Sequence, residues 1–308
     1  MAWPLARKGD LWPKVNKRLQ HMELHSIDTG LFKLDGGAMF GVVPKTLWSK
    51  VHPADADNLC TWAMRCLLVE TGGRLILIDN GIGDKQGDQF FSHYHLHGDA
   101  TLEGSLKKLG HGLDDITDVF LTHLHFDHCG GSIRRQGDQL VPAFRNATYW
   151  SNRWHWEWAT KPNPREKASF LKENILPIQE SGQLKFVEAE RAAPEGTPMV
   201  KDLFPGFDVL MVNGHTDAMM VPHLHYKGRT VIYLADLMPS RHHIPLPWVI
   251  GYDTRPLLSM QEKAPVLERA ADQGSVLFFE HDHDTECALV ARTEKGVRVQ
   301  RTFRLDEL

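Results

Sequence analysis

The feature that most constrains how this chain can fold is a cluster of polar residues placed directly after an apolar segment. ITDVFLT (residues 116–122) is typical of a short buried strand, and HLHFDH (123–128) follows it without a break. Histidine and aspartate are poor material for a protein core unless they are paired or bound to a metal ion. The sequence therefore predicts strands that deliver polar side chains from one end into a metal site.

Three more apolar segments, over residues 207–214, 230–236 and 275–281, are also typical of short buried strands. Each of them leads to a further candidate metal ligand. These three ligands are His215, Asp236 and His281. A sheet that delivers several polar side chains from its strand ends is a rigid way to build one site.

The spacing within the cluster also fits metal binding. Alternate residues of an extended segment point the same way, so His123 and His125 can hold one ion. Asp127 and His128 follow where the chain turns, and they can face a second ion nearby. Imidazole and carboxylate groups suit zinc, with manganese, iron and cobalt as alternatives.

Composition gives no support to several other classes of protein. A formal net charge of −4 gives no electrostatic reason to expect nucleic acid or an anionic membrane as a partner. No apolar stretch approaches the ~20 residues of a membrane span, and the N-terminus lacks the apolar region of a signal peptide. The four cysteines are scattered, so neither a disulfide framework nor a Cys-based zinc site is expected. We expect a cytoplasmic protein.

The sequence predicts a short N-terminal extension and one large domain. Residues 1–21 are basic and interrupted by prolines, which predicts an extension outside the folded core, and residues 22–308 are expected to form one domain. Within this domain, RCLLVETGGRLILIDNG (65–81) predicts a β-hairpin and residues 101–110 predict a helix. Residues 190–202, rich in proline and glycine, predict an internal loop.

Taken in order, the motifs THLHFDH, GHTD, LAD and EHD resemble those of the metallo-β-lactamase superfamily, over roughly residues 22–290. The resemblance implies an α/β (α+β) fold, namely a four-layer αβ/βα sandwich with two mixed β-sheets face to face. The ligands that it implies are His123, His125 and His215 for one metal ion, Asp127, His128 and His281 for the other, and Asp236 as a bridge. IDNGIG (78–83) resembles the family's Asp-x-Gly loop, so Asp79 is expected to orient a ligand.

The implied chemistry is hydrolysis with two divalent metal ions, of which zinc is favoured. Two adjacent metals can share a hydroxide as the nucleophile, because they lower the pKa of bound water. Asp127 and Asp236 are the catalytic carboxylates, since Asp127 could move the proton to the leaving group and Asp236 would hold both ions. The β-lactamases of the superfamily lack a bridging aspartate here, so Asp236 argues against antibiotic degradation.

The substrate class follows from a finer resemblance. Residues 32–45 and 60–70 resemble the branch that contains N-acyl-homoserine lactonases and methyl parathion hydrolase-like phosphotriesterases. We therefore favour a small hydrophobic lactone or ester, first an N-acyl-homoserine lactone, with a phosphotriester as the second choice. A non-catalytic metal-binding protein is the alternative from another class. The resemblance also implies a homodimer.

One departure from the lactonase pattern concerns the groups around the substrate. Many lactonases place a tyrosine three residues after the bridging aspartate, but this chain has Pro239 there. The candidates to replace that tyrosine, unless they only line a loop, are His242, His243 and Tyr252.

Aromatic and histidine-rich stretches leave further alternatives. Trp150, Trp154 and Trp158 recur every four residues, which predicts one aromatic face on a helix. That face is either a core or dimer contact, or an apolar wall of the substrate pocket formed together with Met39, Phe40 and Trp248. HYHLH (93–97) is expected to form a loop or lid rather than to bind metal. His283 is the alternative to His281, and Cys129 is expected to be a packed small residue.

Overall fold

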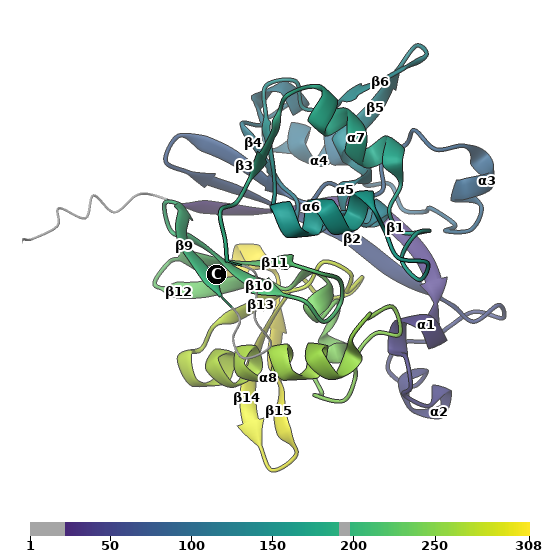
Figure 1. Cartoon of the computed structure of the whole chain (residues 1–308). Helices are drawn as coiled ribbons and strands as arrows, with labels where there is room; N and C mark the ends of the chain where they lie inside the picture. The colour runs from purple at the N-terminus through teal and green to yellow at the C-terminus, as the bar shows by residue number, and fades with distance from the viewer. Residues whose placement is uncertain (1–21, 191–197) are drawn as a thin grey trace, which may run out of the picture.

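The computed structural model describes residues 22–190 and 198–308 (Figure 1). The extension expected over residues 1–21 lies outside the described residues, as does part of the loop expected over 190–202. The remainder of that loop, from Met199, belongs to a strand.

Two mixed sheets form the centre of the molecule. The first has six strands in the order β1-β2-β3-β4-β7-β8. Its strands are β1 (Glu23–Asp35), β2 (Leu59–Thr71), β3 (Arg74–Ile78), β4 (Asp118–Phe120), β7 (Thr148–Ser151) and β8 (Leu184–Phe186). Neighbours from β1 to β3 run antiparallel, whereas β3, β4, β7 and β8 run parallel.

The second sheet has seven strands in the order β15-β14-β13-β12-β11-β10-β9. Its strands are β9 (Met199–Phe204), β10 (Phe207–Val212), β11 (Met219–Tyr226), β12 (Arg229–Tyr233), β13 (Val276–Phe278), β14 (Cys287–Thr293) and β15 (Gly296–Phe303). Only β12 and β13 pair in parallel. A separate hairpin joins β5 (Ile133–Gln136) to β6 (Gln139–Pro142).

Helices cover the outer faces of the two sheets. The α-helices are α1 (Gly36–Phe40), α2 (Lys45–Trp48), α3 (Asp88–Phe91), α4 (Leu102–Lys108), α5 (Phe126–Cys129), α6 (Arg153–Thr160), α7 (Lys172–Glu180) and α8 (Pro256–Gln273). Short 3-10 turns are η1 (Leu113–Asp115), η2 (Gly130–Ser132), η3 (Ala235–Leu237), η4 (Arg241–His243) and η5 (Leu305–Glu307). Figure 1 shows α4, α6 and α7 on one side of the molecule and α8 on the other.

The alternation of apolar side chains explains these layers. On β2, Leu67 and Val69 face the core between the sheets, whereas Cys66 and Leu68 face the core under the helices that include α4 and α7. Apolar residues of α8, among them Leu267, belong to the same connected cluster and pack against the second sheet, where α8 contacts β14. The predicted four-layer sandwich is therefore confirmed, because the two sheets share an apolar core and helices pack on their outer faces.

Several local predictions are confirmed as well. β2 and β3 form the expected hairpin, in which Thr71 pairs with Arg74. The expected helix is α4, whose first turn is capped by Thr101, since the Thr101 hydroxyl accepts the N–H of Gly104. All four cysteines are buried and free.

The prediction that three tryptophans share one helical face is wrong. Trp150 belongs to β7, and only Trp154 and Trp158 lie on α6. The side chain of Asn152 caps α6 by accepting the N–H of His155, so the helix cannot extend back to Trp150. The Trp150 indole donates instead to Asp118, at the start of β4 and so at the opposite end of this strand from the histidine cluster.

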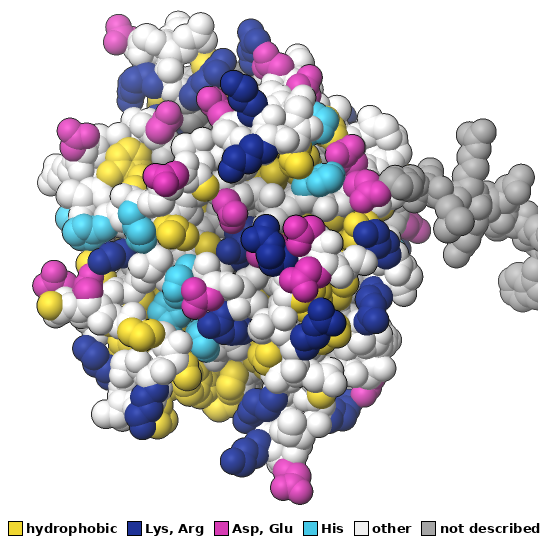
Figure 2. Space-filling model, turned by 180° about the vertical axis from the view of Figure 1, so that it is seen from behind, with side chains coloured by type: hydrophobic (Ala, Val, Ile, Leu, Met, Phe, Trp, Pro, Cys, Tyr) yellow, Lys and Arg dark blue, Asp and Glu magenta, His cyan; other side chains and the backbone are white. Residues whose placement is uncertain are grey.

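Among the described residues, no helix is long and apolar enough to cross a membrane. Figure 2 shows acidic and basic side chains interspersed over the face that it draws, with histidines gathered in several places.

Candidate metal centre

The ends of strands from both sheets meet at one place. His123 and His125 follow β4, and Asp127 and His128 lie on the short helix α5 that comes next. The second sheet contributes three residues that follow β10, β12 and β13, namely His215, Asp236 and His281. The structure thus brings together every candidate ligand that the sequence predicts, and all of them are buried or nearly so.

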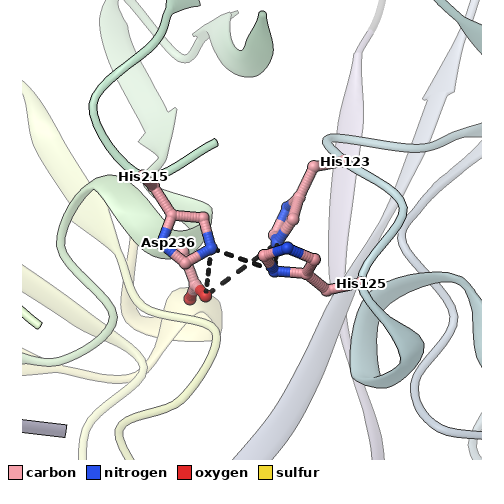
Figure 3. Close-up of side chains that lie close together, drawn as sticks. All are labelled: His123, His125, His215 and Asp236. Atoms are coloured by element: carbon pink, nitrogen blue, oxygen red, sulfur yellow. Dashed lines mark hydrogen bonds and ion pairs between the residues drawn. The ribbon is translucent and has the colours of Figure 1, made fainter. Parts of the chain in front are cut away.

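One group consists of three histidines and Asp236 (Figure 3). His125 Nδ1 lies 3.1 Å from His123 Nε2 and 3.1 Å from His215 Nε2. Asp236 Oδ2 lies 3.1 Å from His215 Nε2. The ligands of a tetrahedral zinc ion, with bonds of about 2.0–2.1 Å, lie about 3.3 Å from one another. The side chains are therefore spaced as ligands of one ion would be.

A second group consists of Asp127, His128 and His281. The Nε2 atoms of the two histidines lie 3.2 Å apart, and Asp127 Oδ2 lies 3.8 Å from each of them. Asp236 Oδ1 approaches His281 Nε2 to 3.1 Å, although its Oδ2 faces the first group. The carboxylate of Asp236 therefore contacts both groups.

The donor set fits two divalent metal ions. Imidazole nitrogens and carboxylate oxygens are the ligands that zinc and its neighbours in the first transition row accept. Asp236 Oδ1 is buried and accepts no hydrogen bond from the described residues. A bound ion would satisfy this oxygen, which is otherwise costly to bury.

The pKa directions of His123 and Asp236 suit metal binding. The pKa values of His215 and His281 are raised instead, because the charge of Asp236 outweighs the effect of burial. Burial lowers the pKa of His123 well below its usual value, and the nearby His128 and His125 lower it further. Burial acts to raise the pKa of Asp236, but the charges of His215 and His281 outweigh burial and hold that pKa well below its usual value. A neutral imidazole and an ionised carboxylate are the forms that bind metal.

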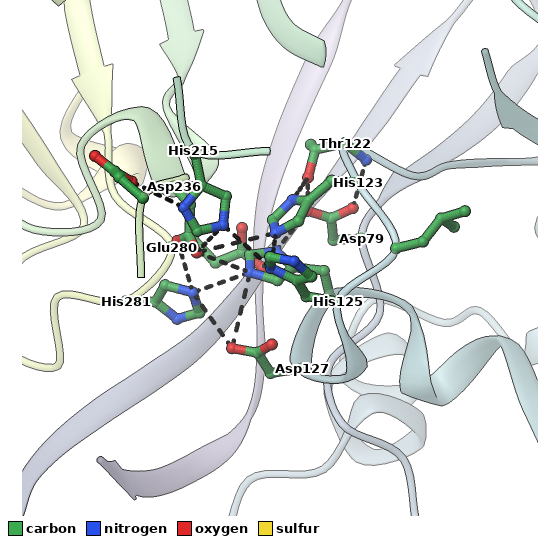
Figure 4. Close-up of polar contacts among 12 residues, drawn as sticks. Asp79, Thr122, His123, His125, Asp127, His215, Asp236, Glu280 and His281 are labelled. Carbon is green, nitrogen blue, oxygen red and sulfur yellow. Dashed lines mark hydrogen bonds and ion pairs between the residues drawn. The ribbon is translucent and has the colours of Figure 1, made fainter. Parts of the chain in front are cut away.

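The remaining ring nitrogens of four histidines have hydrogen-bond partners, and part of this network is drawn in Figure 4, whereas His125 Nε2 has only Glu166 Oε1 at 3.5 Å. His281 Nδ1 donates to the carbonyl of Ala63 over 2.7 Å, and His215 Nδ1 lies 3.0 Å from Asp253 Oδ1. Such contacts hold a metal-binding histidine in one tautomer and orientation. Rings that are held in this way need little reorganisation to bind an ion.

Asp79 lies where the sequence places it, beneath the cluster. Its carboxylate accepts the backbone N–H and the hydroxyl of Thr122, and Oδ2 lies 3.2 Å from His128 Nδ1. Asp79 has a φ of 56°, in the left-handed region that L-residues rarely adopt. These contacts support the proposed role of Asp79 in orienting a ligand.

Three acidic residues at the site have no counterpart in the sequence predictions. Asp253 contacts His215 as described above, Glu280 Oε1 lies 3.1 Å from His128 Nδ1, and Glu166 Oε1 lies 3.5 Å from His125 Nε2. Burial raises the pKa of Glu280 to about 7. Of these three acids, only Glu280 has a signal in the sequence, because it directly precedes the predicted ligand His281.

The proposed contribution of Asp253 can be measured. Asp253→Ala is expected to lower metal affinity by about tenfold to a hundredfold, because His215 loses the group that orients it. Asp253→Asn keeps an acceptor for Nδ1 and is expected to lose less. Metal per chain after equilibrium dialysis against a series of free zinc concentrations gives the affinity.

A matched control exists on β10. Asp208 Oδ2 lies 3.0 Å from His225 Nε2, which is the same kind of contact outside both ligand groups. Asp208→Ala should therefore leave metal affinity unchanged. Equal affinities for the Asp208 and Asp253 alanine variants would contradict the orienting role.

The groups proposed to replace the lactonase tyrosine occupy different surroundings. His243 is buried between Ser240 Oγ, 2.8 Å from Nδ1, and the carbonyl of Met39, 2.9 Å from Nε2, and burial lowers its pKa to about 3. His242 packs edge-on against His52. The pKa of Tyr252 is raised by burial and then by the charge of Asp127, a residue of the second group.

The other histidines and Cys129 do not join either ligand group. His283 pairs with Asp284 and packs against His52, so His281 is the histidine at the site. His93, His95 and His97 follow α3, as expected for a loop, and neither group includes them. Cys129 is buried, with its thiol directed at the carbonyl of Leu124.

Comparison with known proteins agrees with the fold and the site. The model of the metallo-beta-lactamase superfamily matches residues 65–281, and the chain belongs to this superfamily. The protein is therefore a metal-dependent hydrolase, which sets aside the alternative of a non-catalytic metal-binding protein.

Individual relatives include a metal-dependent hydrolase and lactonases. A probable metal-dependent hydrolase from Staphylococcus aureus, of solved structure, is 26% identical with a TM-score of 0.80, over 93% of this chain and 98% of that one. AidC, a dizinc quorum-quenching lactonase solved with the product N-hexanoyl-L-homoserine, is 22% identical with a TM-score of 0.72, over 92% and 96%. An N-acyl homoserine lactonase of Bacillus thuringiensis is 24% identical over 251 residues, which are 77% of this chain and 87% of the relative.

Proposed function

We propose that the protein opens the ring of lactones, with N-acyl-homoserine lactones as the favoured substrate, using two divalent metal ions of which zinc is favoured. The proposed ligands are His123, His125, His215 and Asp236 in one group and Asp127, His128, His281 and again Asp236 in the other. The observation that carries the proposal is the position of Asp236, whose carboxylate contacts both groups. The names of the lactonase relatives supply the substrate class.

The chain's own residues have separate tasks in this reaction. When bound, two such ions supply an activated water and polarise the carbonyl under attack. Oδ2 of Asp127 faces His128 and His281, so Oδ1 remains to accept the proton of the attacking water and return it to the ring oxygen that leaves. No serine or cysteine nucleophile is required.

Aromatic rings beside the cluster suit an acyl chain. Phe126 stands between His125 and Asp127 in the chain, and its ring centroid lies 4.7 Å from that of Tyr94 and 5.4 Å from that of Phe90. The same apolar cluster contains Met39, Phe40 and Trp248, the residues proposed from the sequence for a pocket wall, and within it Met39 and Phe40 are buried. Apolar walls with a few polar groups are typical of sites for hydrophobic substrates.

Tyr252 is the candidate that best replaces the missing lactonase tyrosine. His243 uses both ring nitrogens within the fold, whereas Tyr252 is 40% exposed as a residue and its phenol interacts with the charge of Asp127. Tyr252→Phe is expected to lower kcat by about tenfold to a hundredfold with metal content unchanged. This loss lies at or below the ~10²–10³-fold effect of a full oxyanion donor, because metal ions share that task. Steady-state kinetics with metal analysis measures both quantities, and an unchanged kcat would assign the role elsewhere.

The proposed function is tested by hydrolysis of a long-chain N-acyl-homoserine lactone by zinc-loaded protein. Metal-depleted protein and an aryl phosphotriester are measured alongside. Fast lactone opening that requires metal supports the proposal. Fast cleavage of the phosphotriester with slow lactone opening would assign a phosphotriesterase instead, and no hydrolysis of either substrate would overturn the proposed substrate class.

A further inference from the structure

His155 is a buried histidine that joins two segments of backbone near the cluster. It lies in the first turn of α6, and its Nε2 is 2.8 Å from the backbone nitrogen of Leu124. Its Nδ1 is 2.6 Å from the carbonyl oxygen of Asp217. An amide N–H only donates and a carbonyl only accepts, so Nε2 is the acceptor and Nδ1 carries the hydrogen. The ring is therefore neutral and held in one tautomer.

The two segments that His155 joins carry the histidines of one ligand group. Leu124 stands between His123 and His125, which follow a strand of the first sheet. Asp217 lies two residues after His215, which follows a strand of the second sheet. A single imidazole thus spans the two halves of the sandwich at the place where the ring nitrogens of this group come within 3.1 Å of one another.

The start of α6 strengthens the same connection. Asn152 Oδ1 accepts the backbone N–H of His155, and Asn152 Nδ2 donates to the carbonyl of Ala218. The first contact caps α6, and the second ties the start of α6 to the loop that carries His215. The ligands of the second group have other partners for their remaining nitrogens, namely Asp79 and Glu280 for His128 and the Ala63 carbonyl for His281.

We propose that His155 is a positioning residue, which sets the distance between the His123–His125 segment and His215 and thereby the metal affinity of that group. The inference rests on the proposed assignment of these three histidines as ligands. It does not depend on which lactone or ester is the substrate. Loss of the bridge would let the two segments move apart and weaken one of the two metal sites more than the other.

The test is a titration of metal-depleted full-length protein with Co²⁺, followed by visible absorption, which reports coordination geometry as well as occupancy. His155→Leu removes both hydrogen bonds, whereas His155→Gln can both accept and donate. His223→Leu is the matched control, because His223 is a buried histidine on β11 whose Nδ1 lies 3.1 Å from the carbonyl oxygen of Val221, outside both ligand groups. Far-UV circular dichroism shows which variants fold.

The wild-type protein and His223→Leu are expected to bind two Co²⁺ ions with the same affinities. His155→Leu should bind one of the two about tenfold to a hundredfold more weakly, with an altered visible spectrum, and His155→Gln should recover most of the loss. If His155→Leu does not fold, His155→Asn replaces it, because the shorter amide reaches only one of the two backbone groups and must bind more weakly than His155→Gln.

Each result has one meaning. Equal titrations of the wild-type protein and the folded leucine or asparagine variant would overturn the positioning role and leave the ligand assignment intact. A wild-type protein that binds no Co²⁺ would overturn the ligand assignment itself. A loss shared equally by His223→Leu would show a general effect of removing a buried histidine and would also overturn the proposal.

Discussion

Replacement of Asp236 by alanine is expected to reduce kcat/KM by at least about a thousandfold and to lower the metal content below two ions per chain. The carboxylate has one oxygen 3.1 Å from His215 Nε2 and the other 3.1 Å from His281 Nε2, so its loss removes a ligand from both groups at once. Metal ions contribute several kcal/mol of charge stabilisation in the transition state, and this amount corresponds to about a thousandfold in rate.

Asp236→Asn separates the two tasks of this residue. An amide has one oxygen that can bind metal, so the asparagine variant should hold more metal than the alanine variant while it still loses most activity. Metal analysis and steady-state kinetics on the same preparations measure both effects. Near wild-type turnover by Asp236→Ala would refute the bridging position.

Removal of metal has the second large expected effect. Dialysis against a chelator should abolish hydrolysis and lower the melting temperature by several degrees, because a ligand present at a thousandfold over its Kd stabilises the folded state by about 4 kcal/mol. The stripped protein also keeps five buried imidazoles in contact, including His128 and His281 with nitrogens 3.2 Å apart. Calorimetry with and without metal measures the stability, and an activity assay follows the loss.

Adding metal back to the stripped protein distinguishes loss of activity through metal removal from loss through damage to the protein. Zinc, manganese, cobalt and iron(II), added singly to the stripped protein, should each restore some activity, and the metal that gives the highest kcat/KM at equal occupancy is the candidate native ion. Full activity in protein shown to be free of metal would overturn the metal-dependent mechanism.

The sequence predicted the seven candidate ligands because they follow a rule of backbone geometry. Because side chains alternate along an extended chain, His123 and His125 point to the same side. Apolar segments of strand length lead to His215, Asp236 and His281, so these residues were expected at strand ends. The orienting acids Glu166 and Asp253 escaped prediction, because each is a lone carboxylate in a segment without periodicity. Their positions depend on how long loops fold over the site.

The tryptophan prediction failed for a similar reason. Spacing of four residues is compatible with a helix but does not fix where the helix begins. The side chain of Asn152 and the pairing of Trp150 with Phe120 in the sheet decided that Trp150 belongs to β7. The helix cap at Asn152 therefore decided where the helix begins, although the periodic pattern indicated an earlier start. As a result, Trp150 does not lie on the helical face that was proposed as a pocket wall.

The origin of the candidate ligands in both sheets has a consequence for how the molecule is assembled. An ion held between Asp127 and His281 would act as a cross-link between the N-terminal and C-terminal halves of the chain, closing a loop of about half its length. Closure of so long a loop carries a large entropic cost in a flexible chain, and that cost must be met by packing of the sandwich before a complete ligand set exists. Metal uptake would therefore come late in folding, because the complete ligand set exists only after the two halves have docked correctly.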